Sequence, residues 1–291
     1  MDLERYGAYV YSRVMPRKKI LLFSLAVGTS LLFLAGFFFI REEGDPSPLF
    51  PLITELTEET QSQVATPTYI EVIDSCGADY AGGCVNIRIE PSNTAPSLMQ
   101  VRTGVVLPVA STTVTDGEGR TWYKVHFTEW IRYQDRVPKN WYVAGDYVRP
   151  FFDAGAQDLI AESNPKTDKR IVVDRSEQKL YAYDGDTLFL ESSISTGRDL
   201  TPTPRGSFEV YRKMPSRYMQ GPLPGISDQY YDLPGVPWNL YFTKEGGAIH
   251  GAYWHTEFGN PWSHGCVNLP LDTARKLYEW TPLGTSVIVQ D

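Results

Sequence analysis

The chain has 291 residues and a net charge of −8, and its 42% apolar and 13% aromatic residues exclude global disorder. The charge is uneven, because the first 19 residues carry five basic and two acidic side chains, which leaves −11 on the remainder. An acidic remainder argues against nucleic-acid binding, which normally uses a basic face. This length allows two modest domains and an additional segment.

An apolar run of 21 residues, 20–40, contains no charge and no proline. As a helix it spans about 30 Å, the thickness of the hydrocarbon core of a bilayer. A buried core helix is usually shorter and shows a polar face. A cleaved signal peptide has a shorter apolar run followed by an A-x-A site. We therefore expect a single transmembrane helix, with residues 1–19 in the cytoplasm under the positive-inside rule and the following residues outside.

Residues 41–67 are polar, acidic and rich in proline, which predicts a linker between the membrane and the folded part. Cys76 and Cys84 follow in a glycine-containing stretch. In an oxidising exterior they predict a small disulfide-closed loop, with two unpaired buried thiols as the alternative. Cys266 is then left over, and a lone thiol outside the cell needs a reason.

Residues 68–152 contain short runs rich in β-branched and aromatic residues. These predict strands at 68–73, 85–89, 104–109, 122–127 and 140–143. The stretches VNIRIEPS, GVVLPVAS, WYKVHF and NWYVAGDYV resemble bacterial SH3-like modules, which are small five-stranded barrels, and WIRYQDRVPK departs from their short hairpin. Trp122, Trp130 and Trp141 could line a peptide groove, but packing in the core and at its rim is the better interpretation.

A second polar linker, residues 153–167, leads into a last domain at 168–291 that is again mainly β. Strands are predicted at 169–174, 179–183, 187–196, 207–212 and 285–289. Apolar residues at i, i+3, i+6 and i+7 predict one helix over 271–280. The prolines within 214–237 predict a long irregular loop, and such loops are often lids.

Residues 249–269, IHGAYWHTEFGNPWSHGCVNL, gather three of the four histidines around Cys266. A free thiol is only a few per cent thiolate at neutral pH, and a nearby imidazole makes it a competent nucleophile. Gly265 lets the backbone approach a substrate closely, and successive amides at a tight turn can hold an oxyanion. The segment therefore predicts a cysteine nucleophile.

This pattern resembles the YkuD-type catalytic domain of the L,D-transpeptidase family: HG, sixteen residues from His250 to Cys266, and SHGC followed by a hydrophobic residue and Asn. The stretches VDRSEQKLYAYDGD and STGRDLTPTPRGSF resemble the opening of the same domain, so the resemblance covers about residues 168–290. Ala252 stands where threonine is frequent. The resemblance implies a β-sandwich with the cysteine under a mobile lid.

The resemblance also implies roles for individual residues. Cys266 matches the nucleophile, His250 the base, and Gly251 the residue whose carbonyl orients the imidazole. The backbone amides of His264, Gly265 and Cys266 would form the oxyanion hole. Ser263 and Asn268 match motif positions that shape the turn. They are also substrate-binding candidates, together with Trp238 and Tyr241 of a lid expected at 214–241 and with Tyr253.

The implied reaction is attack of Cys266 on the third residue of a peptidoglycan tetrapeptide stem. D-alanine leaves, and an amine of a neighbouring stem resolves the thioester to give a 3→3 cross-link. The alternatives are L,D-carboxypeptidase hydrolysis and a non-catalytic cell-wall-binding protein. A zinc site of His250, His255, His264 and Cys266 has allowed ligands but matches no common spacing, and a structural cysteine leaves the glycines and histidines unexplained. We expect no metal and no cofactor. His255 is interpreted as a wall residue of the cleft and His126 as a surface histidine.

Overall fold

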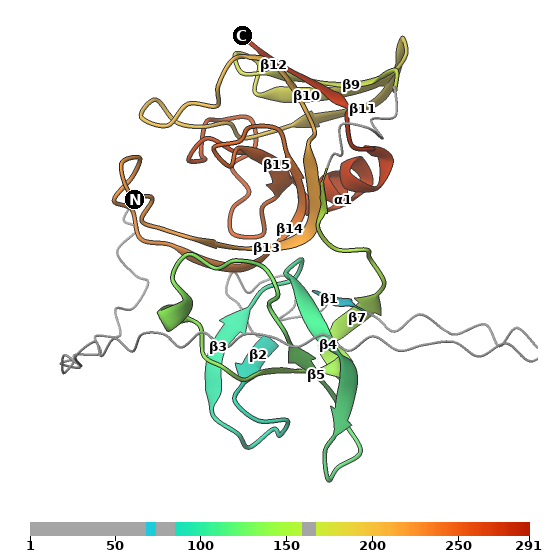
Figure 1. Cartoon of the computed structure of the whole chain (residues 1–291), viewed down its shortest axis with the longest axis vertical. Coiled ribbons are helices and arrows are strands. Elements are labelled where there is room, and N and C mark those ends of the chain that lie inside the picture. Colours follow the sequence, from blue (N-terminus) through green and yellow to red (C-terminus); the bar gives the residue numbers. More distant parts are fainter. Residues whose placement is uncertain (1–67, 74–84, 159–166) are drawn as a thin grey trace, which may run out of the picture. The chain divides into compact units, whose positions relative to one another are not determined.

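The computed structural model describes residues 68–73, 85–158 and 167–291 (Figure 1). This part of the chain is mainly β, with one α-helix and two short 3₁₀ helices. The predicted transmembrane segment 20–40, the linker 41–67, and both Cys76 and Cys84 lie outside the described residues. Among the helices that the structure does describe, none is long and apolar enough to cross a membrane.

The first sheet is antiparallel and has the strand order β3-β2-β6-β5-β4-β1-β7. Its strands are β1 (Tyr69–Val72), β2 (Val85–Arg88), β3 (Ser97–Val101), β4 (Val106–Thr115), β5 (Thr121–Val125), β6 (Trp141–Ala144) and β7 (Val148–Phe151), and its 3₁₀ helices are η1 (Gln134–Arg136) and η2 (Gly145–Tyr147). All five predicted strands of this region are confirmed. Strands β3 and β7 were not predicted.

The packing interpretation of the tryptophans is confirmed for two of the three. Trp122 and Trp141 are 1% and 2% exposed, and Trp141 packs edge-on against Phe127. Trp130 is 58% exposed and lies in the segment between β5 and β6. The large buried rings supply the apolar area that a small sheet needs for a stable core.

The remaining strands form two five-stranded sheets. One has the order β11-β10-β9-β17-β12, and the other has the order β16-β15-β14-β13-β8. The bounds are β8 (Gln157–Asp158), β9 (Lys169–Asp174), β10 (Lys179–Asp184), β11 (Thr187–Ser193), β12 (Gly206–Glu209), β13 (Arg212–Gln220), β14 (Asp232–Tyr241), β15 (Ala248–Gly251), β16 (Val267–Leu269), α1 (Leu271–Trp280) and β17 (Ser286–Gln290). The predicted helix is confirmed at both ends. Strand β8 lies within the stretch predicted as a linker.

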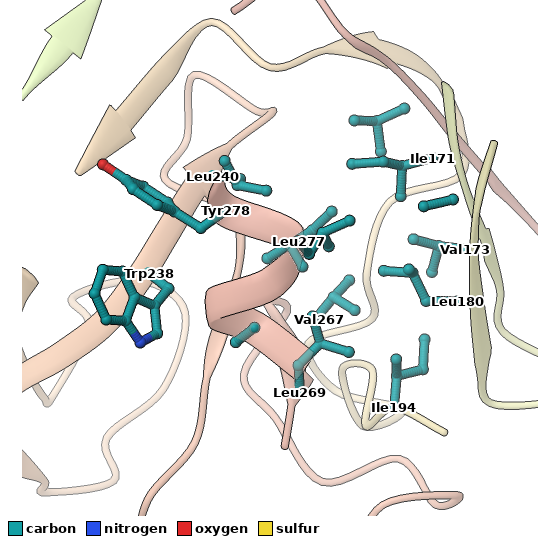
Figure 2. Close-up of a cluster of buried hydrophobic side chains, with 14 of the residues drawn as sticks. Ile171, Val173, Leu180, Ile194, Trp238, Leu240, Val267, Leu269, Leu277 and Tyr278 are labelled. Atoms are coloured by element: carbon teal, nitrogen blue, oxygen red, sulfur yellow. The ribbon is translucent and has the colours of Figure 1, made fainter. Parts of the chain in front are cut away.

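One buried apolar cluster joins these two sheets through α1. Figure 2 shows Ile171 and Leu180 of one sheet and Leu240 of the other, with Leu277 of the helix among them. Each of these four side chains is at most 1% exposed. The periodic apolar face of α1 is therefore buried between the sheets, which fixes β14, β15 and β16 beside the helix.

The prediction of an irregular loop over 214–237 is wrong for most of its length. Strands β13 and β14 form a long antiparallel pair here, and only residues 221–231 between them are outside strands. The prolines fit because β14 meets β15 only at Leu240 and Tyr241, so Pro234 and Pro237 lie where β14 has one strand partner rather than two. A proline costs no ladder hydrogen bond on such an unpaired edge.

Strand β13 also contacts the first sheet. The hydroxyl of Ser216 donates to the carbonyl oxygen of Val106 at 2.5 Å, and both residues are buried. Tyr218 packs edge-on against Phe127 and Trp141. The β13–β14 pair is thus stabilised by contacts with the first sheet as well as by the hydrogen bonds between its two strands.

Candidate active site

The residues before β16 form a tight turn around Cys266. The Ser263 hydroxyl accepts the Gly265 amide at 3.1 Å and donates to the Cys266 carbonyl at 2.5 Å. Gly265 has a φ of +116°, a conformation that residues with a side chain rarely adopt. Ser263 and Gly265 therefore shape the turn.

A second loop, residues 196–203, lies outside the SHGC motif and is hydrogen-bonded to this turn. Thr203 is fully buried, accepts the Gly197 amide at 2.9 Å and donates to the Gly265 carbonyl at 2.9 Å. A Cβ on Gly197 would lie 2.9 Å from the Gly265 Cα and would overlap the Thr201 carbonyl. Sequence reasoning did not single out Thr203 or Gly197. The only indication of these two residues in the sequence was that they lie in the STGRDLTPTPRGSF stretch, which resembles the opening of the family's catalytic domain.

Strand register brings His250 to the face that carries Cys266. In the parallel pair of β15 and β16, Ile249 lies opposite Val267 and His250 opposite Asn268. Extending this register by one residue places Cys266 opposite Ala248. Because side chains alternate along a strand, His250 points to the same face as Ala248, and hence as Cys266.

The hydrogen bond of His250 fixes its tautomer. Its Nδ1 lies 3.0 Å from the carbonyl oxygen of Gly251, so Nδ1 must carry the proton and Nε2 presents a lone pair. The ring is only 2% exposed, and burial lowers its pKa to about 4, against the partial opposition of the Gly251 hydrogen bond. His250 is therefore a neutral imidazole with one basic nitrogen at neutral pH.

Burial raises the pKa of the Cys266 thiol, and the Ala248 backbone amide lowers it to a lesser extent. The cysteine packs against a small apolar cluster of Met214, Tyr241 and Ala248, and its sulfur lies 4.0 Å from the carbonyl oxygen of Gly246. Apolar surroundings disfavour the thiolate. The two pKa shifts therefore favour the uncharged forms, a thiol on Cys266 and a neutral imidazole on His250.

The side chain of His255 lies against that of Asn268. Its Nδ1 accepts the Glu257 amide at 3.1 Å, so in the neutral ring Nε2 carries the proton. The Asn268 side-chain amide lies 2.9 Å from Nε2 and must therefore present its oxygen, which would otherwise be buried without a partner. Burial, followed by the charge of Arg198, lowers the pKa of His255 to about 4, which is consistent with this neutral pair.

The His264 ring contacts the connection between β13 and β14. Its Nε2 lies 2.7 Å from the Gln229 side-chain oxygen, and its ring stacks on Tyr231 at 5.4 Å. Burial, and then the charge of Arg198, lowers the pKa of His264. The ring is therefore bound to the β13–β14 connection, whereas the His264 backbone is part of the turn before β16.

Comparison with known families agrees with this arrangement. Residues 168–289 match the YkuD family model, the L,D-transpeptidase catalytic domain. This segment is an L,D-transpeptidase catalytic domain. A protein of Bacillus licheniformis, provisionally named as the L,D-transpeptidase YkuD, is 28% identical over 130 residues, which are 43% of this chain and 68% of the relative. The family resemblance predicted for the last domain is confirmed.

Two solved L,D-transpeptidases are also similar to this chain. A variant of the Enterococcus faecium enzyme is 29% identical with a TM-score of 0.39, and the match covers 43% of this chain and 50% of that one. The enzyme of Mycobacterium smegmatis is 20% identical with a TM-score of 0.41, covering 76% and 99%. This chain thus spans about half the length of the Enterococcus structure.

The amides of the L,D-transpeptidase turn differ in their availability for an oxyanion. The Gly265 amide is already bound to Ser263. Within the described residues, the amides of His264 and Cys266 donate to no other group. In this state of the turn, these two amides are the ones that can receive an oxyanion.

The three predicted aromatic contacts lie in different places. Tyr241 is 9% exposed and belongs to the cluster behind Cys266. Tyr253 donates its hydroxyl to the Pro234 carbonyl at 2.7 Å. Trp238 is 3% exposed and packs against Phe151 and Tyr278 in the main core, where its contacts are those of a packing residue.

The zinc alternative finds no support in the arrangement of its four side chains. His250 bonds to Gly251, His255 to Asn268 and His264 to Gln229, so each imidazole is aimed at a different partner. In residues 68–73, 85–158 and 167–291, no three His, Cys, Asp or Glu side chains are placed to hold a metal ion.

Proposed function

We propose that the protein cross-links peptidoglycan by L,D-transpeptidation, with Cys266 as the nucleophile and His250 as the base. The observation that supports this most strongly is the tautomer of His250. Its Nδ1 proton is committed to the Gly251 carbonyl, so the lone pair of Nε2 lies on the face of β15 and β16 that carries Cys266. A family match over residues 168–289 supplies the reaction class.

The first half-reaction begins from the neutral pair. Cys266 gives its thiol proton to Nε2 of His250 as the sulfur attacks the carbonyl carbon of the third stem residue. The oxyanion is received by the amides of His264 and Cys266. Collapse breaks the amide bond, His250 returns the proton to the leaving nitrogen, and D-alanine departs, leaving a thioester on Cys266.

The second half-reaction runs the same groups in reverse. The side-chain amine of a neighbouring stem loses a proton to His250 and attacks the thioester carbonyl. The thiolate leaves and takes the proton back from His250, so that the thiol is regenerated. The new bond joins the third residues of two stems. Water in place of the amine would give the carboxypeptidase reaction instead, so exclusion of water from the site determines the outcome.

A product analysis tests this proposal. The full chain is incubated with a disaccharide-tetrapeptide, and the products are weighed. Loss of D-alanine together with a dimer is expected, and Cys266→Ser should give neither product. Loss of D-alanine without dimer would assign the carboxypeptidase reaction. An unchanged substrate, with a folded protein, would indicate a non-catalytic wall-binding protein.

For the remaining chain, we propose that residues 20–40 anchor the protein, with 1–19 in the cytoplasm and the domains at 68–152 and 168–291 outside. The apolar run and the charges around it support this topology. Protease added to intact spheroplasts should digest the outer domains, and their survival would refute it. We also propose that residues 68–152 are an SH3-like module.

The predicted disulfide between Cys76 and Cys84 also stays a proposal. Non-reducing peptide mapping should find Cys76 linked to Cys84 and Cys266 free. Closing so short a loop should stabilise the module by about 3 kcal/mol at most. A bridge that contains Cys266 would contradict the catalytic assignment as well, because the nucleophile would then be blocked.

A further inference from the structure

We propose that Tyr133 and Arg136, which belong to the segment between β5 and β6 in the first sheet, are positioning residues of the active site. They hold the connection between β13 and β14, residues 221–231, against His264. This connection is called the lid tip below, and residues 133–136 are called the brace. The first domain thereby completes the catalytic site, in addition to any role in wall binding.

The brace is bound to the base of the lid tip through Gln220. The side-chain oxygen of Gln220 accepts the Tyr133 backbone amide at 2.7 Å, and its nitrogen donates to the Tyr133 carbonyl at 3.3 Å. The same nitrogen donates to Asp232 at 3.0 Å. Gln220 is 3% exposed, so these bonds are formed away from competing water. One buried amide therefore joins the brace to both ends of the lid tip.

Arg136 and the Tyr133 hydroxyl grip the lid tip at its first two residues. The Arg136 guanidinium donates to the Gly221 carbonyl at 2.7 Å, and the Tyr133 hydroxyl donates to the Pro222 carbonyl at 2.8 Å. The guanidinium also lies over the Tyr133 ring at 3.7 Å and the Tyr230 ring at 4.8 Å. A guanidinium that stacks on two rings while donating to a carbonyl is held in one orientation.

The two sides of the lid tip are pressed together at the point where Arg136 binds. The Gly221 amide donates to the Tyr231 carbonyl at 2.9 Å. A Cβ on Gly221 would overlap the Tyr231 ring and the Gln229 carbonyl. Movement of Gly221 therefore moves Gln229 and Tyr231 with it.

Gln229 and Tyr231 are the residues of the lid tip that reach the cysteine turn. Gln229 bonds to His264 at 2.7 Å, and Tyr231 stacks on the same ring. Tyr231 is half-buried, and burial, followed by the nearby Cys266, raises its pKa to about 12. The contacts thus run without a gap from the brace through the lid tip to His264, whose backbone amide is one of the two oxyanion donors.

This arrangement predicts opposite changes in two reactions of Cys266. If the contacts between the brace and the lid tip are removed by substitution, the lid tip should move away from His264 and open the site to small reagents. Alkylation by iodoacetamide should then become faster, whereas acylation by a stem peptide should become slower because the oxyanion amide is misplaced. A displacement of about 1 Å in a catalytic site costs roughly 10²-fold in rate, so a loss of roughly tenfold to 10²-fold in acylation is expected.

The test compares Arg136→Met and Tyr133→Phe with a matched control in the same domain. Arg120→Met is the control, because it removes an arginine ion pair with Asp146, at 2.7 Å, that does not involve the lid tip. Both brace variants should show faster alkylation of Cys266, slower acylation and faster amide exchange in residues 221–231. Tyr133→Phe removes only one hydroxyl, so it keeps the test available if Arg136→Met does not fold.

A double variant separates positioning from general destabilisation. If the brace acts through the lid tip, Arg136→Met should slow acylation less in the Gln229→Ala background, which has lost the hydrogen bond to His264, than in the wild type. Brace variants that match Arg120→Met in both reactions, or that add their full effect to Gln229→Ala, would overturn the proposal. The inference depends on the proposed function only for acylation. If the wild type releases no D-alanine, that function fails, and the alkylation and exchange contrasts still decide the role of the brace.

Discussion

Thr203 joins two loops of the site through a single hydroxyl, which donates to the Gly265 carbonyl at 2.9 Å. The same oxygen accepts the amide of Gly197 at 2.9 Å. The bond to Gly265 fixes the peptide that follows it, whose N–H belongs to Cys266. Thr203 therefore supports the orientation of the Cys266 amide, which we propose as an oxyanion donor, from outside the motif.

Thr203→Val should slow acylation without changing the chemistry of the thiol. Valine keeps the shape, but it leaves the buried Gly197 amide and Gly265 carbonyl without this partner, which costs about 1–3 kcal/mol for each unsatisfied group. We expect acylation to fall by up to roughly 10²-fold, while the pH dependence of Cys266 alkylation stays that of the wild type. Stem acylation and iodoacetamide kinetics measure the two effects.

Thr113→Val is the control for this substitution, since Thr113 is an exposed threonine of β4. It should leave both reactions unchanged. A shifted alkylation profile in Thr203→Val would mean that Thr203 acts on the thiol itself, and equal acylation by the two variants would show that the bond to Gly265 is dispensable.

Gly197→Ala should be more damaging than its size suggests. Its Cβ would overlap the Thr201 carbonyl and press on the Gly265 Cα, and both are backbone atoms that cannot rotate away. We expect a lower melting temperature, with a loss of stability of about 1–3 kcal/mol from overpacking, and slower acylation. Gly117→Ala meets nothing within 4 Å and is the matched control in thermal unfolding. Equal melting temperatures would contradict the close approach of the two loops.

The sequence predicted the parts of the site that are close together along the chain. HG, SHGC and the asparagine after it form two strand ends and one turn, so their spacing specifies Cys266, His250 and Asn268 directly. The partners Thr203 and Gln229 could not be predicted in this way. Thr203 is 62 residues from its partner Gly265 along the chain, and Gln229 is 35 residues from its partner His264. Both contacts therefore depend on how the sheets pack.

The fold was predicted best where local pattern and packing agree. The helix Leu271–Trp280 has both an apolar period and a buried face, and its bounds match. The β13–β14 pair was not predicted because its prolines argue against strands. That argument holds for a strand that is paired on both edges, where proline loses a ladder hydrogen bond. The directions of the pKa shifts of Cys266 and His250 also could not be predicted, because they depend on how each group is packed in the folded structure.

The two motif histidines should differ in what their loss removes. His250→Ala removes the proposed base, so acylation should fall by about 10²–10⁴-fold, and alkylation of Cys266 below pH 7 should fall with it. His264→Ala breaks only the contact to the lid tip, so alkylation should persist while acylation weakens. His126→Ala, at an exposed position of the first domain, is the control. Alkylation that is lost in His264→Ala but retained in His250→Ala would exchange the two roles.

The lowered pKa of His250 predicts that the free energy of unfolding decreases as the pH becomes acidic. Burial brings this pKa to about 4, below the value of about 6.5 in the unfolded chain. As the pH falls through 6.5, the unfolded state takes up a proton first, so the free energy of unfolding falls until about pH 4. At about 1.4 kcal/mol per pKa unit, His250 accounts for on the order of 3 kcal/mol of this loss. Because His250 stays unprotonated down to its pKa of about 4, the rate of stem acylation should fall only near pH 4 as the pH is lowered. Urea unfolding between pH 4 and 8 measures the stability change, and His250→Asn should flatten its slope while His126→Asn should not. An acid limb near pH 6.5 in the wild type, or equal slopes in the two variants, would show that His250 is not the buried neutral base that the structure describes.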